Sequence, residues 1–357
     1  MKHHSIAAAL FCLALLLSAR PALGQGCLAA HTSQGNVATI ESAASETHDG
    51  NGPDWLRNKL TIDVGWRSFS SFRHFVGTRE NVQRAINHNQ IKNHQNIYDI
   101  GVEYSVTPQW SFIADVPVLD GTRNQLYSPK GVFQVGGIGD MTVGVQHWVF
   151  RPPTENGGNV ALSASLKLPT GINDATATAT LSNGKVVKAT ADQSLQPGDG
   201  TWGFVLATQA YKRIFWRTNL YFQGSWLFSP QDTTGVPTFR SQKGEGIMSA
   251  TDQYLFRGGF AHGVPKIRHL ELSLGGRMEG VPVRDAFGSS DGFRRPGYII
   301  SLDPGLMYSW HGSTMSVNAP WAVERNRRRS VTDIANGTHG DAAFADYAMI
   351  LNLSHRF

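Results

Sequence analysis

Charged residues, cysteines and long apolar segments are all scarce in this chain, and each shortage excludes a class of protein. Aspartate, glutamate, lysine and arginine make up 17% of 357 residues, with 32 basic against 27 acidic side chains. So small a basic excess does not support nucleic-acid binding, and we expect no nucleic-acid partner. The negative mean hydropathy excludes a bundle of membrane helices, yet it is compatible with strands that are apolar on one face.

The N-terminus has the pattern of an export signal. Lys2 is followed by an almost unbroken apolar run over residues 6–17, and small residues precede Gln25. A membrane anchor needs about 20 apolar residues, which is more than this run offers. We therefore predict a signal peptide over residues 1–24, cleaved near Gln25. The small, polar and aperiodic residues that follow predict a disordered periplasmic lead-in over residues 25–56.

The cysteine content argues against a disulfide-stabilised fold. Cys12 lies in the predicted signal peptide, so only Cys27 is expected in the mature chain. One cysteine forms no intrachain disulfide. Lipidation of Cys27 is the minor alternative, because Gly24 stands where a lipoprotein signal has a leucine-like residue; an incidental thiol is the simpler interpretation.

Glycine is abundant, at 38 residues, and aromatic residues reach 10%, which suits strands and turns. The C-terminal stretch alternates in the way a strand does. Its apolar face carries Tyr347, Met349, Leu351, Leu353, His355 and Phe357, and polar or small residues lie between them. An apolar strand that runs to a terminal phenylalanine is typical of an outer-membrane barrel, whose outward face meets lipid.

The same alternation recurs between residues 57 and 357, and we count about twelve strands, with ten to fourteen as the range. Short connections alternate with long polar ones. The long connections span residues 68–96, 119–136, 170–200, 229–252, 279–296 and 324–345. This rhythm predicts an all-β, transmembrane, antiparallel up-and-down barrel with short periplasmic turns and long outer loops. A soluble sandwich does not require such an alternation of loop lengths.

Two groups of charged residues are candidate sites. Acidic residues within predicted strands fall on the face opposite the apolar set and should point into the lumen, where they pair with basic groups or line a passage: Asp63, Asp99, Glu103, Asp115 and Asp140. A run of arginines forms a basic cluster in the last outer loop, which faces lipopolysaccharide phosphates, folds inward to narrow the pore, or is simply solvated: Arg325, Arg327, Arg328 and Arg329.

Histidines offer weaker candidates for chemistry. His88 and His94 lie in the first long loop without an adjacent carboxylate or thiol, so we predict no metal site and no cofactor there. His147 and His355 fall on predicted lipid-facing positions, where a membrane lipase would place its histidine. A lipase would need a serine within hydrogen-bond reach of either histidine. We therefore expect no enzymatic activity.

Four stretches together resemble a known family. They are Gly137-Ile138-Gly139-Asp140, Leu166-Lys167-Leu168-Pro169-Thr170-Gly171, residues 196–203 (QPGDGTWG), and Arg325-Asn326-Arg327 with Gly340-Asp341 and residues 344–347 (FADY). The set resembles the outer-membrane barrels described as transporters of the MetA pathway of phenol degradation. The resemblance implies an outer-membrane barrel that passes small aromatic or hydrophobic compounds, and it implies no catalytic residues.

The sequence thus predicts a passive channel in the bacterial outer membrane. Its expected partners are the lipid and lipopolysaccharide around it, a small-molecule solute, and the barrel assembly machinery, which would contact the terminal strand ending at Phe357. Two alternatives stay open. One is a non-transporting structural or adhesive surface barrel, and the other is an outer-membrane lipase.

Overall fold

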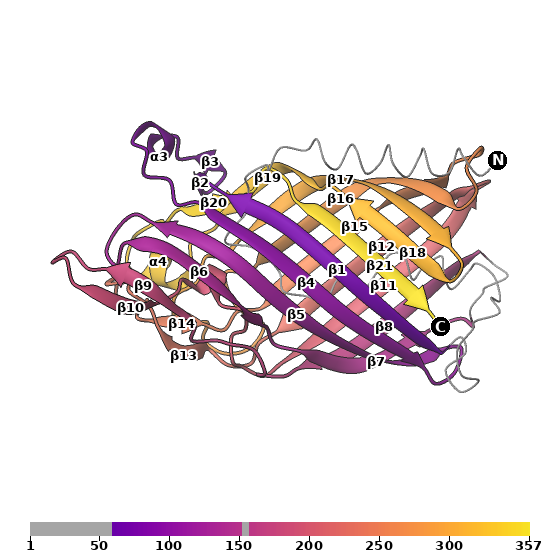
Figure 1. The fold of residues 1–357 in the computed structure, drawn as a ribbon, viewed down its shortest axis with the longest axis horizontal. Coiled ribbons are helices and arrows are strands. Elements are labelled where there is room, and N and C mark those ends of the chain that lie inside the picture. Colours follow the sequence, from indigo (N-terminus) through magenta and orange to yellow (C-terminus); the bar gives the residue numbers. More distant parts are fainter. Residues whose placement is uncertain (1–58, 152–156) are drawn as a thin grey trace.

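The computed structural model describes residues 59–151 and 157–357, and within them the chain forms a closed antiparallel barrel of 12 wall strands (Figure 1). The predicted all-β up-and-down barrel is therefore confirmed. The predicted signal peptide (residues 1–24), the lead-in (residues 25–56) and Cys27 lie outside the described residues. No helix in the described ranges is long and apolar enough to cross a bilayer.

Most wall strands are continuous and pair with their neighbours in sequence. They are β1 (Leu60–Ser71), β4 (Asn93–Ser105), β5 (Trp110–Gln125), β8 (Gly158–Lys167), β11 (Gly203–Phe215), β12 (Thr218–Phe228), β15 (Gln253–Gly263), β16 (Leu270–Val281), β17 (Gly297–Trp310) and β21 (Met349–Arg356). The other two wall strands are each interrupted once. One consists of β6 (Gly131–Ile138) and β7 (Thr142–Trp148), which both pair with β5. The other consists of β18 (Ser313–Asn318) and β19 (Trp321–Arg327), which both pair with β17.

The wall closes where the first strand meets the last. Trp66 in β1 lies opposite Leu351 in β21 on one side and opposite Tyr98 in β4 on the other. Closure leaves the barrel without an open sheet edge, so the backbone amides of the wall pair with those of neighbouring strands.

Side chains alternate between an apolar outer face and a polar lumen. Along β21, Leu353 is exposed on the outside while Ser354 is buried inside, as the terminal pattern predicted. Aromatic side chains gather on the outer face near both ends of the wall. Trp226 stacks on Tyr254 at 5.1 Å between ring centroids near the long loops, and Tyr308 stacks on Trp310 at 5.8 Å near the short turns. Such aromatic belts are typical of membrane interfaces.

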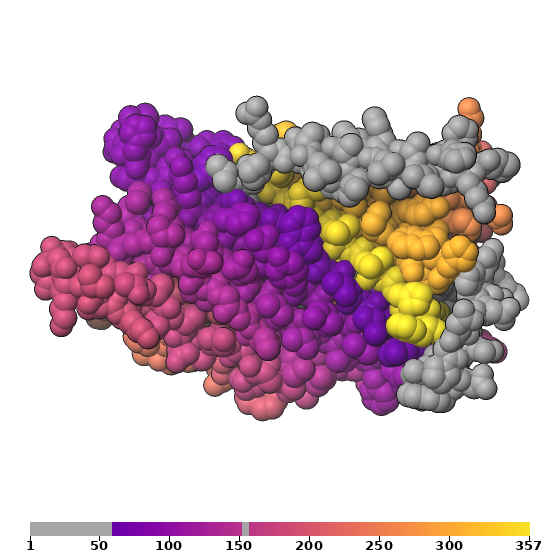
Figure 2. Space-filling model, viewed as in Figure 1, coloured from indigo at the N-terminus to yellow at the C-terminus, as the bar shows by residue number. Residues whose placement is uncertain are grey.

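The long loops all lie at the end of the barrel opposite the C-terminus, as Figure 1 shows. They carry small elements of their own: β2 (Arg73–Val76), β3 (Arg79–Glu80), α3 (Gln83–Ile86), β9 (Thr176–Thr180), β10 (Val186–Thr190), η1 (Gln193–Leu195), β13 (Thr233–Pro237), β14 (Ile247–Ser249), α4 (Val331–Ala335) and β20 (Ala342–Phe344). The β9–β10 hairpin projects beyond the rest of this end (Figure 2). We call this end the outer end and the other the short-turn end.

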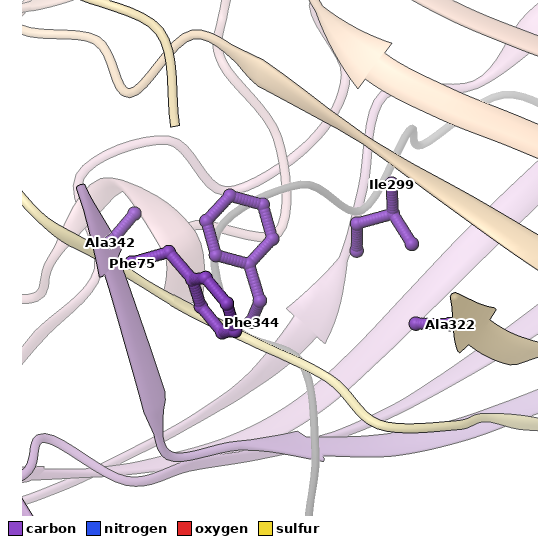
Figure 3. Close-up of a cluster of buried hydrophobic side chains, with 5 residues drawn as sticks. All are labelled: Phe75, Ile299, Ala322, Ala342 and Phe344. Atoms are coloured by element: carbon purple, nitrogen blue, oxygen red, sulfur yellow. The ribbon is translucent and has the colours of Figure 1, made fainter. Parts of the chain in front are cut away.

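Two apolar clusters hold these loops at the outer end. In the first, Phe75 of β2 meets Phe344 of β20 edge to face at 5.6 Å, beside Ile299 and Ala322 of the wall (Figure 3). In the second, Leu195 packs with side chains of β6 and β9. The loops are therefore packed onto the barrel mouth and partly into it.

Candidate passage through the barrel

The half of the lumen nearer the short-turn end, which we call the inner half, contains a hollow of about 140 Å³. Most of the residues that line it have amide, hydroxyl or charged side chains, and they come from strands around most of the wall. The lining includes Asp63, Glu103, Asp115, Thr142, Gln146, Ser163, Ser165, Gln209, Gln223, Ser225, Arg257 and Arg277. Gln209 donates a hydrogen bond to Gln146 at 2.9 Å, and this amide pair forms part of the lining.

Three neighbouring strands bring four of the five predicted lumen acids together. In the register of β1, β4 and β5, Asp63, Gly101 and Asp115 lie side by side. A β-carbon added to Gly101 would come within 3.3 Å of Asp63 Cβ and 3.6 Å of Asp115 Oδ1, so the glycine leaves room for both acidic side chains. Asp99 and Glu103 follow on the same face of β4. We call these four residues (Asp63, Asp99, Glu103 and Asp115) the acidic wall.

A charged brace crosses the lumen just outward of the inner hollow. Arg67 of β1 donates a hydrogen bond to Glu279 of β16 at 2.6 Å, and Arg277 reaches the same carboxylate at 2.9 Å. All three side chains are almost fully buried. Along β16, Arg277 lines the inner hollow and Val281 lines a second hollow, so the brace lies between the two.

The outer hollow has a volume of about 100 Å³ and a mixed lining. Leu227, Met248 and Val281 supply apolar surface, while Gln95 and Lys167 supply polar groups. On every wall strand that reaches both hollows, the residues lining the outer hollow lie nearer the outer end than those lining the inner hollow. The two hollows are therefore stacked along the barrel axis.

A loop segment lines the outer hollow on the side of the outer end. Asp192 accepts two hydrogen bonds from Arg295, at 2.7 and 2.6 Å, and also faces Arg123 of β5 at 3.4 Å. Burial alone would raise the pKa of Asp192, but Arg123 and Arg295 outweigh burial and hold the pKa well below its usual range. Gln95 of the wall donates to the carbonyl of Ser194 at 2.5 Å. We call residues 191–199 the plug.

Asp140 lies apart from the other predicted lumen acids. It occupies the interruption between β6 and β7, where its carboxylate accepts hydrogen bonds from the backbone N–H groups of Gly171 at 2.9 Å and Asp199 at 2.8 Å. Lys167 approaches the same carboxylate at 3.4 Å. Asp140 therefore anchors two loop segments to the wall, although it also borders the outer hollow.

The structure separates the four arginines of the predicted basic cluster. Arg325 and Arg327 belong to strand β19, where alternation turns both side chains inward. Arg325 pairs with Asp346, and Arg327 pairs with Asp333 at 2.9 Å. Arg328 is exposed and Arg329 is partly buried. The cluster is thus split, because a strand reaches further along the chain than the polarity of this segment suggested.

Of the two histidines considered for a lipase, only His355 has a serine within hydrogen-bond reach. The ring of His147 lies 4.3 Å from that of Trp110 on the outer face. His355 Nδ1 lies 2.8 Å from Ser313 Oγ, which is the contact that a lipase requires. The His355 ring also packs against Phe357, edge to face at 4.5 Å. A phenyl ring does not orient a general base as a carboxylate or amide does, so this pair lacks the third member of a triad.

A more complete triad lies where the sequence gave no signal. Ser70 Oγ lies 2.8 Å from His94 Nδ1, and Asn96 Nδ2 lies 3.3 Å from His94 Nε2. Trp66 Nε1 donates to Asn96 Oδ1, so the Asn96 amide nitrogen faces the histidine as a donor. His94 Nε2 must then accept, and the ring proton lies on Nδ1 toward Ser70. In that tautomer His94 takes no proton from Ser70, and the group is a structural hydrogen-bond chain.

His88 lies in the turn after α3 in a left-handed backbone conformation. Within residues 59–151 and 157–357, no three histidine, cysteine or acidic side chains gather in a way that would hold a metal ion.

No family model and no curated protein matches the chain. Among solved structures, an outer membrane channel from Pseudomonas putida F1 is similar, with a TM-score of 0.54 and 12% identity over 87% of this chain and 100% of that one. The chain shares the barrel fold of that channel. The β domain of the Bordetella autotransporter BrkA (TM-score 0.45, 11% identity, 83% of this chain and 100% of that one) and the P. putida toluene transporter TodX (0.41, 12%, 86% and 91%) are more distant in shape. The resemblance to the MetA-pathway barrels stays a prediction.

Proposed function

We propose that this protein is a passive channel for small solutes in the bacterial outer membrane. The observation that carries the proposal is the pair of hollows stacked inside a closed wall, each bordered by polar and charged side chains. A barrel that only braces a membrane has no need of internal hydrated space. Transport would be diffusion down a gradient, and the plug and the brace would limit the size of the solute.

The outer face supports the proposed location. Exposed apolar side chains cover the wall between two aromatic belts, and long loops gather at one end only. This arrangement suits a membrane with lipopolysaccharide at the loop end and periplasm at the short-turn end. Export by the segment over residues 1–24 and recognition of the terminal strand by the barrel assembly machinery belong to the same proposal.

The linings point to the kind of solute. The outer hollow offers apolar contacts from Leu227, Met248 and Val281. The inner hollow offers amides, hydroxyls and three acids of the acidic wall, namely Asp63, Glu103 and Asp115. A small aromatic compound with a hydroxyl or amino group would use both surfaces in turn. The acidic wall disfavours a carboxylate on the same ring, because like charges repel at short range.

The brace provides the sharpest test. Changing Arg67 to methionine removes the cross-lumen contact, while Glu279 keeps Arg277 as a partner. We expect single-channel conductance of the purified protein in planar bilayers, and liposome swelling with phenol-sized solutes, to rise at least about twofold. Arg79→Met, on exposed β3, is the matched control and should leave conductance unchanged.

A plugged, non-transporting surface barrel is the second candidate, and the tight contacts of Asp192 favour it. Silence of both the wild-type protein and Arg67→Met in bilayers and liposomes would support that candidate and overturn the channel.

A further inference from the structure

The short-turn end carries a concentrated basic surface that the channel does not use. It is formed by the turn between β11 and β12 and the turn between β15 and β16. We define the basic rim as the exposed cations of these turns together with their exposed apolar tips: Arg213, Phe215, Trp216, Arg217, Lys266, Ile267 and Arg268. Phe215 is 71% exposed and Trp216 is 66% exposed, which is unusual for side chains of this size.

The two turns form one surface. The backbone N–H of Gly263 donates to the carbonyl of Arg217 at 2.9 Å, and Arg217 Nη1 donates to the carbonyl of Val264 at 3.3 Å. The ring of Trp216 meets that of His262 edge to face at 6.4 Å. These contacts hold the cations of both turns close together, so the positive charge is a fixed feature of the rim.

The two turns contain no acidic residue that could offset the positive charge of the rim. Residues 212–217 and 262–270 contain no aspartate or glutamate. Among the described residues, no ion pair to a carboxylate is found for Arg213, Arg217, Lys266 or Arg268. At the outer end, by contrast, arginines such as Arg295 and Arg327 are matched with aspartates. An anion from outside the chain is therefore the natural partner of the rim.

The apolar tips identify that anion as part of a membrane. Tryptophan and phenylalanine next to arginine are favoured at the boundary between headgroups and acyl chains, where the rings enter the apolar layer and the guanidinium groups meet phosphates. The guanidinium of Arg217 lies 5.6 Å from the ring centre of Trp216, so the two side chains present one mixed surface. A soluble anion would not require Phe215 and Trp216 to be exposed.

We propose that the basic rim binds the phosphate groups of anionic phospholipids in the periplasmic leaflet of the outer membrane. The proposal rests on the location given under Proposed function, because it needs the short turns to face the periplasm. It assigns the rim a partner that the channel itself does not require. A ring of bound anionic lipid would fix the depth of the barrel at this leaflet.

The test uses the full mature chain in neutral detergent micelles, titrated with phosphatidylglycerol or with phosphatidylethanolamine of the same acyl length. Retained lipid is measured by native mass spectrometry. We expect phosphatidylglycerol to be retained at least about tenfold better, because each cation near an anionic surface contributes roughly fivefold. The combined variant Arg213→Gln, Arg217→Gln, Lys266→Gln and Arg268→Gln should lose that preference.

A charge-matched control keeps the test specific. The combined variant Arg79→Gln, Lys92→Gln, Lys185→Gln and Lys188→Gln removes four exposed cations from the outer end and should retain phosphatidylglycerol as the wild type does. Folding of each variant is checked by the heat-dependent migration of the barrel on electrophoresis. Trp216→Ser, which keeps the charges, should weaken retention of the lipid without abolishing its preference for phosphatidylglycerol.

Three outcomes would overturn the lipid site. They are equal retention of the two lipids by the wild type, equal loss in the rim and outer-end variants, or displacement of the lipid by millimolar inorganic phosphate, which would indicate a free-anion site instead. Conductance of the rim variant is recorded in parallel. Unchanged conductance with lost lipid preference separates the rim from the channel, and silent wild-type bilayers with intact lipid preference would reject the channel alone.

Discussion

The outer and inner halves of the lumen differ in how their buried acidic side chains are arranged. In the outer half, carboxylates are matched with basic groups: Asp192 with Arg295 and Arg123, and Asp333 with Arg327. In the inner half, four acids gather on adjacent strands, while Arg277 pairs with Glu279 and Arg257 pairs with Asp303. The outer half is closed by its ion pairs, whereas the inner half keeps its acids toward a hollow.

This difference separates two roles of charge in one barrel. A buried pair fixes geometry, because breaking it leaves an uncompensated charge in a poorly hydrated place. Acids that border water create a field and hold little structure. The outer charges should therefore matter for loop position, and the acidic wall should matter for which solute passes.

The largest effect should come from a substitution that releases the plug. Asp192→Ala removes the carboxylate that two arginines share, and losing one partner of a buried ion pair costs about 3–5 kcal/mol. We expect the plug to leave the mouth, conductance to rise severalfold, and residues 191–199 to become accessible to protease from the outer side. Single-channel recording and limited proteolysis measure both effects.

Asp174→Ala is the control for the plug, since Asp174 is exposed in the same connection between β8 and β11. It should behave as the wild type. Equal conductance of the two variants would mean that the Asp192 contacts do not close the mouth, and the contrast between the halves would fail.

The second-largest effect should be a loss of docking of the outer β2–β20 sheet at low pH. Asp341 lies 3.1 Å from His74 Nδ1 and accepts a hydrogen bond from Arg84 at 2.8 Å. Burial would raise the pKa of Asp341, but the hydrogen bonds from His74 and Arg84 outweigh it and hold the pKa well below its usual range. A depressed pKa stabilises the fold above the unfolded value of about 3.9, and the stabilisation is lost as pH falls through the folded value.

Undocking of residues 77–92 should therefore begin below about pH 4, measured as cleavage by pepsin in that segment. Asp341→Asn should weaken docking at neutral pH by about 1–2 kcal/mol and remove most of the acid step. If the variant keeps the same acid step, the titrating group is another carboxylate of this sheet, such as Glu80, which pairs with Arg73.

The wall was predictable from sequence because its determinants are local. Alternation along one strand fixes which face meets lipid, so Leu353 and Ser354 could be assigned to opposite faces without knowledge of their neighbours. Loop lengths are also local, and they predicted which end carries the long connections. The same reasoning placed Asp63, Asp99, Glu103 and Asp115 on the inward face.

The contacts inside the lumen were not predictable, because they join distant segments. Asp192 and Arg295 are 103 positions apart, and Arg67 and Glu279 are 212 apart. No periodicity links such pairs. Arg325 and Arg327 were assigned to a loop because the segment is polar, yet their carboxylate partners allow it to form a strand. Polarity alone does not distinguish a solvated loop from a strand whose inward charges are paired.

The acidic wall should give the smallest of the three effects. A unit charge beside a water-filled passage contributes about 0.5–1 kcal/mol to the energy of a passing ion. Asp99→Asn and Asp115→Asn should therefore each lower the ratio of cation to anion permeability about two- to fivefold, without altering the barrel. The reversal potential in a potassium chloride gradient measures this ratio, and the effect should shrink as salt concentration rises.

Asp120→Asn provides the internal comparison, since Asp120 lies on the same strand as Asp115 but is exposed on the outer face. Both substitutions replace one aspartate of β5 with its amide, so any difference between them reports the side of the wall on which the side chain lies. A shift for Asp115→Asn alone shows that the inner acids act on the passage. Equal shifts would show that ions sense only the total charge of the protein, and the acidic wall would then be no more than hydrated lining.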